Sequence, residues 1–413
     1  PAPPWQGGAP ADAAASAGWL AAQLAANGDV LPGAAGADWG LTIDALLGLA
    51  ATGLGADQAA ATAAKLAASG EAYIGAAGDP AKWAAVAKMA LALQVAGLDP
   101  AAFPASPVPR NLIAELRAAQ NADGSFGAGD MAFTHPLALI ALARTDGGAP
   151  PARVDWLAAQ RCADPSNAAY GSYGWAAGCG AADPDATAMA IQGLAAAGVG
   201  SQEPALADAV AWLRARQDAA TGGFAGSYSG PNANTTGLAA SALRLAGAQA
   251  AALAAGPASL DTAAAFIGGL TLSCAQATAS GAAIKVADVG AIAFDADGLA
   301  EAEQYGLDQT NTDQFRRSTA QAVLALGGPA LAELTLAGAA GAAPAATCAP
   351  AGAPAGSGDA AGSAASGGGS GQLAVSGAAW PAGGLGLLAG LLALSGAALL
   401  ARRRAMLEGQ ARR

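Results

Sequence analysis

One short pattern recurs along the chain and limits its fold more than any other feature. At residues 120–127 the sequence Gln-Asn-Ala-Asp-Gly-Ser-Phe-Gly lies between two stretches of helical periodicity. Asp-Gly favours a tight turn because glycine accepts a positive φ without steric cost. We expect the adjacent Phe126 to fill the seam between neighbouring helix pairs. Related patterns occur at residues 217–224, 160–175 and, more weakly, 23–30. A helical unit that recurs about every fifty residues predicts a repeat architecture.

The helical stretches alternate between two kinds. Six of them are apolar on nearly every side, which is typical of buried helices: residues 39–49, 80–96, 131–144, 184–197, 234–245 and 312–326. Asp38, Asp79 and Asp183 are their expected N-caps, with Pro80 and Pro184 at the first helical position. More amphipathic stretches lie between them at residues 12–24, 57–68, 109–119, 152–160, 202–216 and 260–272.

Six buried helices surrounded by six outer ones predict an all-α fold. We expect an (α/α)6 toroid of six helical hairpins over residues 12–343, with a central mouth and an N-terminal arm at residues 1–11. Residues 276–310 stay without a clear assignment.

The charge is distributed unevenly along the chain. The 413 residues carry a net charge of −11, which argues against a nucleic-acid-binding surface. The last twelve residues nevertheless contain five arginines and one glutamate. An acidic body with a basic tail is typical of an exported protein that keeps a cytoplasmic stub. Residues 1–5 carry no basic start and no apolar run, so we expect the sequence to begin after signal-peptide cleavage.

The composition changes near residue 344. Residues 344–372 are rich in Ala, Gly, Ser and Pro, which predicts a disordered linker. Residues 382–401 carry no charge and precede Arg402, Arg403 and Arg404, which predicts one transmembrane helix and a cytoplasmic basic tail. A buried core helix is the alternative. We therefore expect an extracellular body at the cell surface, tethered through its C-terminal end.

Four cysteines accompany this topology: Cys162, Cys179, Cys274 and Cys348. In an exported chain they predict two disulfides with three connectivities. We favour Cys162 with Cys179, which flank an aromatic loop at residues 170–175, and Cys274 with Cys348, which would help to close the ring. Free structural thiols are the alternative.

Residues 120–127, 217–224 and 183–190 give the chain a resemblance to the terpenoid cyclase and protein prenyltransferase superfamily, with its prenyltransferase and squalene oxidase repeat. The resemblance covers residues 12–327 and implies the (α/α)6 toroid. The cobalamin carriers look like more distant relatives of the same architecture.

The C-terminal region has a resemblance of its own. Leu373, Ala374, Val375, Ser376 and Gly377, followed by an apolar span and a basic end, resemble a sortase sorting signal of the Leu-Ala-x-Thr-Gly kind found in actinobacteria. Ser376 stands where that signal has threonine. The resemblance implies cleavage after Ser376 by a sortase and attachment of the body to cell-wall peptidoglycan. An ordinary membrane anchor is the alternative.

The superfamily that the chain resembles includes two kinds of enzyme, and the chain has only part of the residue set that each kind requires. Class II cyclases protonate their substrate with an Asp-x-Asp-Asp motif, whereas here Ala186 follows Asp183 and Asp185 in place of the last Asp. A capped helix start is the alternative reading of that segment. The zinc of the prenyltransferases needs three protein ligands, and His135 is the single histidine, with no cysteine near it in sequence. A structural role for His135 is therefore the alternative to a ligand contact.

Inner-helix N-termini would converge at one end of such a toroid, where apolar and aromatic groups with a few polar ones form a ligand site. The candidate ligand-binding residues are Trp39, Trp83, Phe133, His135, Asp185, Thr187, Asn234, Thr235, Phe315 and Arg316. Caps and core side chains are the alternative.

These observations predict a surface-anchored module that binds a ligand without chemistry, cofactor or metal. By analogy alone the ligand is a small hydrophobic, isoprenoid or corrinoid-like molecule. One alternative is a cyclase- or prenyltransferase-like enzyme. Another is a structural wall-attached protein.

Overall fold

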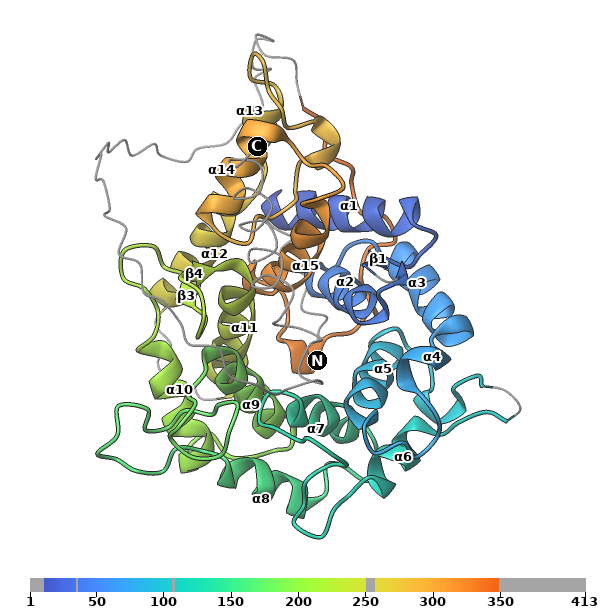
Figure 1. Cartoon of the computed structure of the whole chain (residues 1–413), viewed down its shortest axis with the longest axis vertical. Coiled ribbons are helices and arrows are strands. Elements are labelled where there is room, and N and C mark those ends of the chain that lie inside the picture. Colours follow the sequence, from blue (N-terminus) through green and yellow to red (C-terminus); the bar gives the residue numbers. More distant parts are fainter. Residues whose placement is uncertain (1–10, 35, 106–107, 250–256, 349–413) are drawn as a thin grey trace, which may run out of the picture. The chain divides into compact units, whose positions relative to one another are not determined.

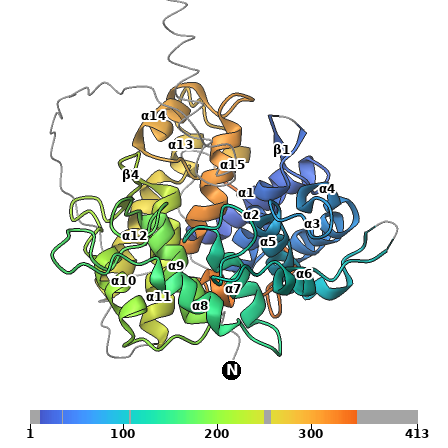
Figure 2. The ribbon, with the colours of Figure 1, turned by 60° about the horizontal axis from the view of Figure 1, so that its bottom comes forward.

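The computed structural model describes residues 11–34, 36–105, 108–249 and 257–348, all within the unit Pro1–Cys348. This unit is all-α, as expected, with two short β-hairpins. The β1–β2 hairpin projects beside the start of α2 (Figure 2). The helices are α1 (Ala11–Ala26), α2 (Trp39–Thr52), α3 (Ala56–Ser69), α4 (Glu71–Ile74), α5 (Trp83–Val95), α6 (Leu112–Ala118), α7 (His135–Ala143), α8 (Pro151–Ala159), α9 (Pro184–Ala196), α10 (Pro204–Arg214), α11 (Ala233–Gln249), α12 (Pro257–Leu270), α13 (Cys274–Ala277), α14 (Ala296–Tyr305) and α15 (Thr312–Ala322). The strands are β1 (Pro32–Gly33), β2 (Gly36–Ala37), β3 (Phe224–Ala225) and β4 (Pro231–Asn232), and short 3-10 turns include η3 (Val323–Ala325) and η4 (Leu331–Glu333).

Six of these helices pack in succession around the middle of the unit. α2 contacts α5, α5 contacts α7, and the series continues through α9, α11 and α15. α15 packs in turn against α2, so the series of contacts closes on itself (Figure 1). We call these six the inner helices. α1, α3, α6, α8, α10 and α12 pack on their outer side.

Among the inner helices, four starts agree with the expected ones to within one residue, and two lie later than expected. The carboxylates of Asp38 and Asp183 accept the backbone N–H groups of Leu41 and Ala186, as N-caps do. Asp79 instead accepts the N–H of Ala81 in a turn, so α5 begins at Trp83 rather than at residue 80.

The other late start is α7, which begins at His135 rather than at residue 131 because residues 132–134 form a turn. The segment without an assignment contains α14, whose first turn is capped by Asp295.

A recurring hydrogen bond, here called the joint, connects a loop to the inner helices α2, α7, α9, α11 and α15 or to the residues just before them. In α2, α9 and α11 a threonine hydroxyl in the first turn accepts the backbone N–H of a residue in the preceding loop. In α15 the threonine lies in the second turn, and its donor lies before α14. The pairs are Leu31 with Thr42, Tyr173 with Thr187, Phe224 with Thr236 and Ile292 with Thr319, all within 2.8–3.0 Å. At Phe126 a carboxylate oxygen of Asp130 replaces the hydroxyl, at 2.7 Å. The repeat read from the sequence is therefore a repeated hydrogen bond as well as a repeated turn.

Phe126 fills the seam that its position predicts. Its ring is fully buried and stacks on Trp83 of α5, with centroids 5.0 Å apart. The guanidinium of Arg153 in α8 lies 3.6 Å from the centroid of the Phe126 ring. One aromatic side chain thus joins the second, third and fourth helix pairs by stacking and by a cation–π contact.

Two turns that precede inner helices require glycine, because φ is positive there and because a neighbouring helix leaves no space for a Cβ atom. Gly124 has a φ of 91°, and a Cβ there would lie 2.2 Å from the carbonyl oxygen of Ala152 in α8. Gly290 has a φ of 95°, and its Cβ would lie 2.1 Å from the carbonyl oxygen of Ala15 in α1. The close approach of Gly290 to α1 joins the last helix pair of the ring to the first.

Residues 327–348, here called the strap, run along the C-terminal ends of the inner helices (Figure 1). The N–H of Leu331 donates to Ser241 of α11, and that of Leu336 donates to the carbonyl of Val95 at the end of α5. Arg144, directly after α7, donates to the strap carbonyls of Ala332 and Leu334. The strap therefore covers this end of the inner helices and leaves their N-terminal end as the candidate ligand end.

Both disulfides that the sequence favours are present: Cys162 bonds to Cys179, and Cys274 bonds to Cys348 at the end of the strap. They indicate an oxidising compartment.

Several expectations lie outside the described residues: the arm, the linker from residue 349 onward, the sorting signal and the helix at residues 382–401. Within the described ranges, none of the helices has the length and apolar character needed to traverse a bilayer.

Candidate ligand-binding site

Two aspartates at the start of α9 form the polar centre of the N-terminal end. Asp183 is 2% exposed, and both of its oxygens are used: Oδ1 accepts the N–H of Ala186, and Oδ2 accepts the hydroxyl of Ser227 at 2.5 Å. Asp185 differs, because its Oδ1 atom is buried and has no hydrogen-bond partner in the described part of the chain. Burial, followed by the negative charge of Asp183, raises the pKa of Asp185 to about 7, and the Thr235 hydroxyl opposes that rise. Burial therefore favours the protonated form of Asp185 at a higher pH than for an exposed aspartate.

The start of α11 faces this carboxyl group. Asn232 caps the helix by accepting the N–H of Thr235, and its amide donates to the Thr235 hydroxyl at 3.1 Å. The Thr235 hydroxyl in turn donates a hydrogen bond to the carboxyl group of Asp185. The Oδ1 atom of Asn234 is buried, and among the described residues it has no partner. Asp185, Asn234 and Thr235 thus combine two unpartnered oxygens with a hydroxyl at the starts of adjacent helices.

Aromatic rings lie on the loops that lead to α7 and α9. Phe133, 5% exposed, contacts Trp175 with ring centroids 5.1 Å apart. The indole Nε1 of Trp175 is buried and finds no acceptor in the described ranges. Trp175 was not among the predicted ligand-binding residues, although its position in a cysteine-flanked aromatic loop was a usable signal.

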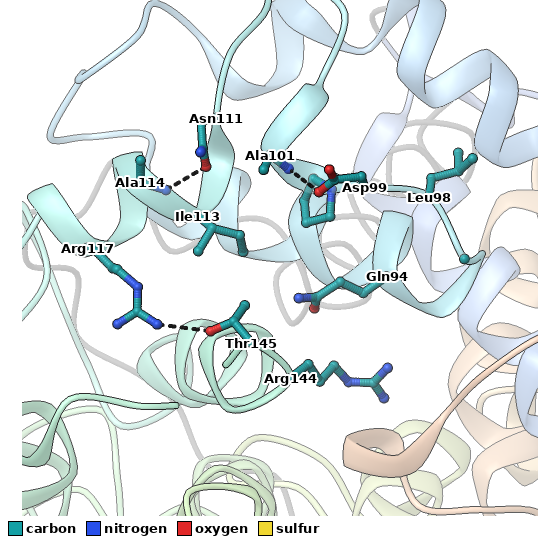
Figure 3. Close-up of a pocket in the computed structure, with 12 residues that line it drawn as sticks. Gln94, Leu98, Asp99, Ala101, Asn111, Ile113, Ala114, Arg117, Arg144 and Thr145 are labelled. Atoms are coloured by element: carbon teal, nitrogen blue, oxygen red, sulfur yellow. Dashed lines mark hydrogen bonds between the residues drawn. The ribbon is translucent and has the colours of Figure 1, made fainter. Parts of the chain in front are cut away.

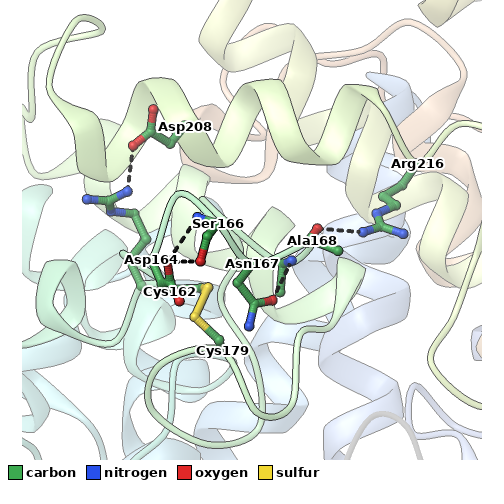
Figure 4. Close-up of a disulfide and its surroundings, with 10 residues drawn as sticks. Cys162, Asp164, Ser166, Asn167, Ala168, Cys179, Asp208 and Arg216 are labelled. Atoms are coloured by element: carbon green, nitrogen blue, oxygen red, sulfur yellow. Dashed lines mark hydrogen bonds and ion pairs between the residues drawn. A yellow bond between two sulfur atoms is a disulfide. The ribbon is translucent and has the colours of Figure 1, made fainter.

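The loop that carries Trp175 is held in several places (Figure 4). The Cys162–Cys179 disulfide joins its two ends. Arg161 forms an ion pair of 2.5 Å with Asp208 of α10, and Arg216 donates to the carbonyl of Ala168. These contacts restrict the loop before any ligand binds, which reduces the entropy cost of binding.

On the opposite side of the inner helices the predicted residues are dispersed. Trp39 is half-buried at the first position of α2, Phe315 is buried, and Arg316 donates to Gln23 of α1 at 2.8 Å. Within the described chain, no hydrogen bond, ion pair or ring contact joins these three residues to Asp185.

A buried ion pair that the sequence reading did not identify lies on this side. Lys88 of α5 contacts Asp44 of α2 at 2.7 Å and donates to the carbonyl of Gly40 at 3.0 Å. Burial raises the pKa of Asp44 despite the opposing charge of Lys88. A lysine inside an otherwise apolar stretch was the available signal, because a buried charge needs a partner.

Two of the predicted ligand-binding residues, His135 and Thr187, use their polar atoms in contacts between parts of the protein. His135 is fully buried: Nδ1 lies 2.6 Å from Asp130, and Nε2 lies 2.9 Å from the carbonyl of Arg153. Thr187 uses its hydroxyl in the recurring joint, accepting from Tyr173 and donating to the carbonyl of Asp183. Their polar atoms therefore stabilise seams between helices.

Trp83 stacks on Phe126 and donates to the carbonyl of Ala128 at 3.2 Å. It also lines a cavity of about 410 Å³, whose lining includes Asp79, Glu115 and Gln120. This cavity is lined by α5, α6 and their loops, and none of the other predicted residues contributes to it.

Within the described ranges, no three His, Cys, Asp or Glu side chains are grouped as a metal site would require. No protein-family model matches the sequence, and no curated protein matches it either. The site is therefore interpreted from its own geometry.

Proposed function

We propose that the body is an (α/α)6 toroid of the terpenoid cyclase and prenyltransferase type, and that it binds a small ligand at the N-terminal end of its inner helices. The closed series of inner-helix contacts supports the toroid. The strap supports the choice of end, since it covers the other one.

One observation carries the binding proposal: Asp185 and Asn234 keep buried oxygens without partners at the starts of two adjacent inner helices. An unpaired buried oxygen costs about 1–3 kcal/mol, so proteins rarely keep two together without a use. They would accept hydrogen bonds from a ligand, while Phe133 and Trp175 offer aromatic surface to its apolar part. The ligand is then a mainly apolar molecule with hydrogen-bond donors, and an isoprenoid or a corrinoid-like molecule is suggested by analogy with the architecture alone.

We also propose that the body is displayed outside the cell and tethered by its C-terminal segment. The two disulfides support an oxidising environment. The sorting-signal resemblance at Leu373–Gly377 and the apolar run at residues 382–401 support attachment to the membrane or wall. A fixed binder retains its ligand at the envelope. If the body stayed in the cell-wall fraction to the same extent in cells that have lost sortase activity, sortase-dependent wall attachment would be contradicted.

The binding proposal is tested by native mass spectrometry of the full chain purified in detergent. We expect a small molecule to co-purify with the wild type and with Asp155→Ala, a control at an exposed carboxylate of α8. Asp185→Ala should retain much less of it. Equal retention by Asp185→Ala would contradict the proposed site.

The raised pKa of Asp185 favours a second candidate, an acid catalyst. A carboxyl group with a pKa of about 7 keeps part of its proton at neutral pH, as an acid that protonates an alkene must. Asp183 stands beside it, but the position of the last motif carboxylate is Ala186. Turnover of a polyprenyl substrate by the wild type, abolished in Asp185→Asn, would replace the binding proposal with the catalytic one.

A further inference from the structure

A second cavity lies at the other end of the inner helices, on the outer side of α5 and α7 (Figure 3). Its volume is about 710 Å³, and it is lined by the end of α5 and its following loop, by α6, and by the residues that end α7. The lining combines two arginines with two amides and an apolar wall: Arg117, Arg144, Gln94, Asn111, Leu98 and Ile113. None of the residues assigned to the Asp185 site takes part, so this is a separate site.

The two arginines lack carboxylate partners. Arg117 donates to the hydroxyl of Thr145 at 2.9 Å and to the carbonyl of Gly148 at 3.1 Å. Arg144 follows α7 directly, and Figure 3 shows the two arginines on either side of Thr145. Among the ion pairs of the described residues, neither arginine appears. In a chain with a net charge of −11, this cavity therefore holds two arginines outside any ion pair of the described residues, although the charge of Glu333 acts on Arg144 at longer range.

Two buried polar atoms at the cavity lack partners as well. The Nε atom of Arg144 is buried and unpartnered within the described chain, although its Nη2 atom holds the strap. Gln94 donates to the carbonyl of Ala141 at 2.9 Å, which leaves its Oε1 atom buried without a donor among described residues. The cavity therefore offers a charged donor and an acceptor to an incoming group. Its one carboxylate, Asp99, already accepts the N–H of Ala101 at 2.8 Å.

The apolar part of the lining is accessible. Leu98 is 42% exposed, and Ile113 projects into the cavity from the first turn of α6 (Figure 3). Exposed apolar groups next to unneutralised arginines match a ligand with a charged head and a hydrocarbon part.

We propose that this cavity binds a small amphiphilic anion, with a phosphate or carboxylate head against Arg117 and its hydrocarbon part along Leu98 and Ile113, while Arg144 contributes positive charge from the far side of Thr145. Guanidinium groups recognise both heads through charge-assisted hydrogen bonds. The acceptor Oε1 of Gln94 suits a head that carries one proton or a hydroxyl, such as a phosphate monoester at neutral pH.

The test uses isothermal titration calorimetry of the full chain with n-butyl phosphate at constant ionic strength. Inorganic phosphate and n-butanol serve as the head and the tail alone. We expect saturable binding of n-butyl phosphate, weaker binding of phosphate and none of n-butanol. Arg117→Gln should weaken binding roughly tenfold or more, since a charge-assisted contact is lost. Lys65→Gln, which removes an exposed cation of α3, should leave it unchanged.

Ile113→Ala separates the two halves of the proposed ligand. It should weaken n-butyl phosphate binding while leaving phosphate binding the same. Vesicles containing phosphatidic acid test whether the phosphate head belongs to a membrane lipid. Binding of these vesicles indicates a lipid ligand, whereas binding of n-butyl phosphate alone indicates a soluble one. The proposal is overturned if no anionic probe binds saturably. Equal weakening in Arg117→Gln and Lys65→Gln would also overturn it, because the attraction would then come from overall charge.

Discussion

Asp185 makes the stability of this protein depend on pH in a direction opposite to that of a salt-bridged aspartate. Its folded-state pKa is raised to about 7 from the ordinary value of 3.8, mainly by burial. The folded protein therefore binds a proton more tightly than the unfolded chain does. Asp185 is neutral in both states below about pH 4, and its ionisation then opposes folding as the pH rises towards 7.

The magnitude follows from the two pKa values. Each pH unit between 3.8 and about 7 contributes about 1.4 kcal/mol, so the full cost at pH 8 is slightly above 4 kcal/mol. This is an upper limit, because a buried carboxylate draws in water when it ionises. Asp185→Asn keeps the shape of the side chain and removes the ionisation. We expect the variant to be more stable than the wild type at pH 8 by about 1–4 kcal/mol, with the difference closing near pH 4.

Urea unfolding of wild type and variant at pH 4, 6 and 8, followed by circular dichroism, measures this difference. Asp155→Asn is the matched control, since it makes the same chemical change at an exposed position of α8. Equal stability of Asp185→Asn and wild type at pH 8 would refute the burial of this carboxyl group. A difference that persisted unchanged at pH 4 would show that packing, rather than ionisation, is responsible.

Three further substitutions test the fold. Phe126→Ala should cost roughly 3–5 kcal/mol in the free energy of unfolding, because it empties a fully buried stack. Gly124→Ala should destabilise the protein more than Gly78→Ala: both glycines have positive φ, but at Gly78 nothing lies within 4 Å of a Cβ, so a thermal melt isolates the contact with Ala152. Cys348→Ser opens a disulfide that spans 74 residues and should cost roughly 4 kcal/mol by loop entropy, lowering the midpoint of denaturant unfolding; an unchanged midpoint would show that the strap stays in place without it.

Much of the local structure was predictable because its causes lie within a few residues. The caps Asp38 and Asp183 bond to N–H groups three residues away, and Phe126 follows a turn that glycine permits. Asp79 failed as a cap for a local reason too, since its carboxylate closes a turn at Ala81. The pairing of the cysteines was favoured by chain order and agrees with the structure.

The site was less predictable because its contacts join helices that are distant in sequence. Asp185 and Thr235 interact across 50 positions, and the Lys88–Asp44 pair joins two inner helices. Whether a polar residue at a helix start faces a seam or a ligand depends on the neighbouring helix, which periodicity does not specify. His135 illustrates this, because Asp130 and the carbonyl of Arg153 occupy both of its ring nitrogens.

The sequence alone thus determined the alternation of helices, their caps and their turns, because propensity, capping and glycine conformation act over one turn of chain. The tertiary structure decided the closure of α15 on α2, the course of the strap and the choice of which polar atoms remain unpaired. Those features depend on packing between segments that meet only after the chain has folded, where burial sets the cost of each unpaired group.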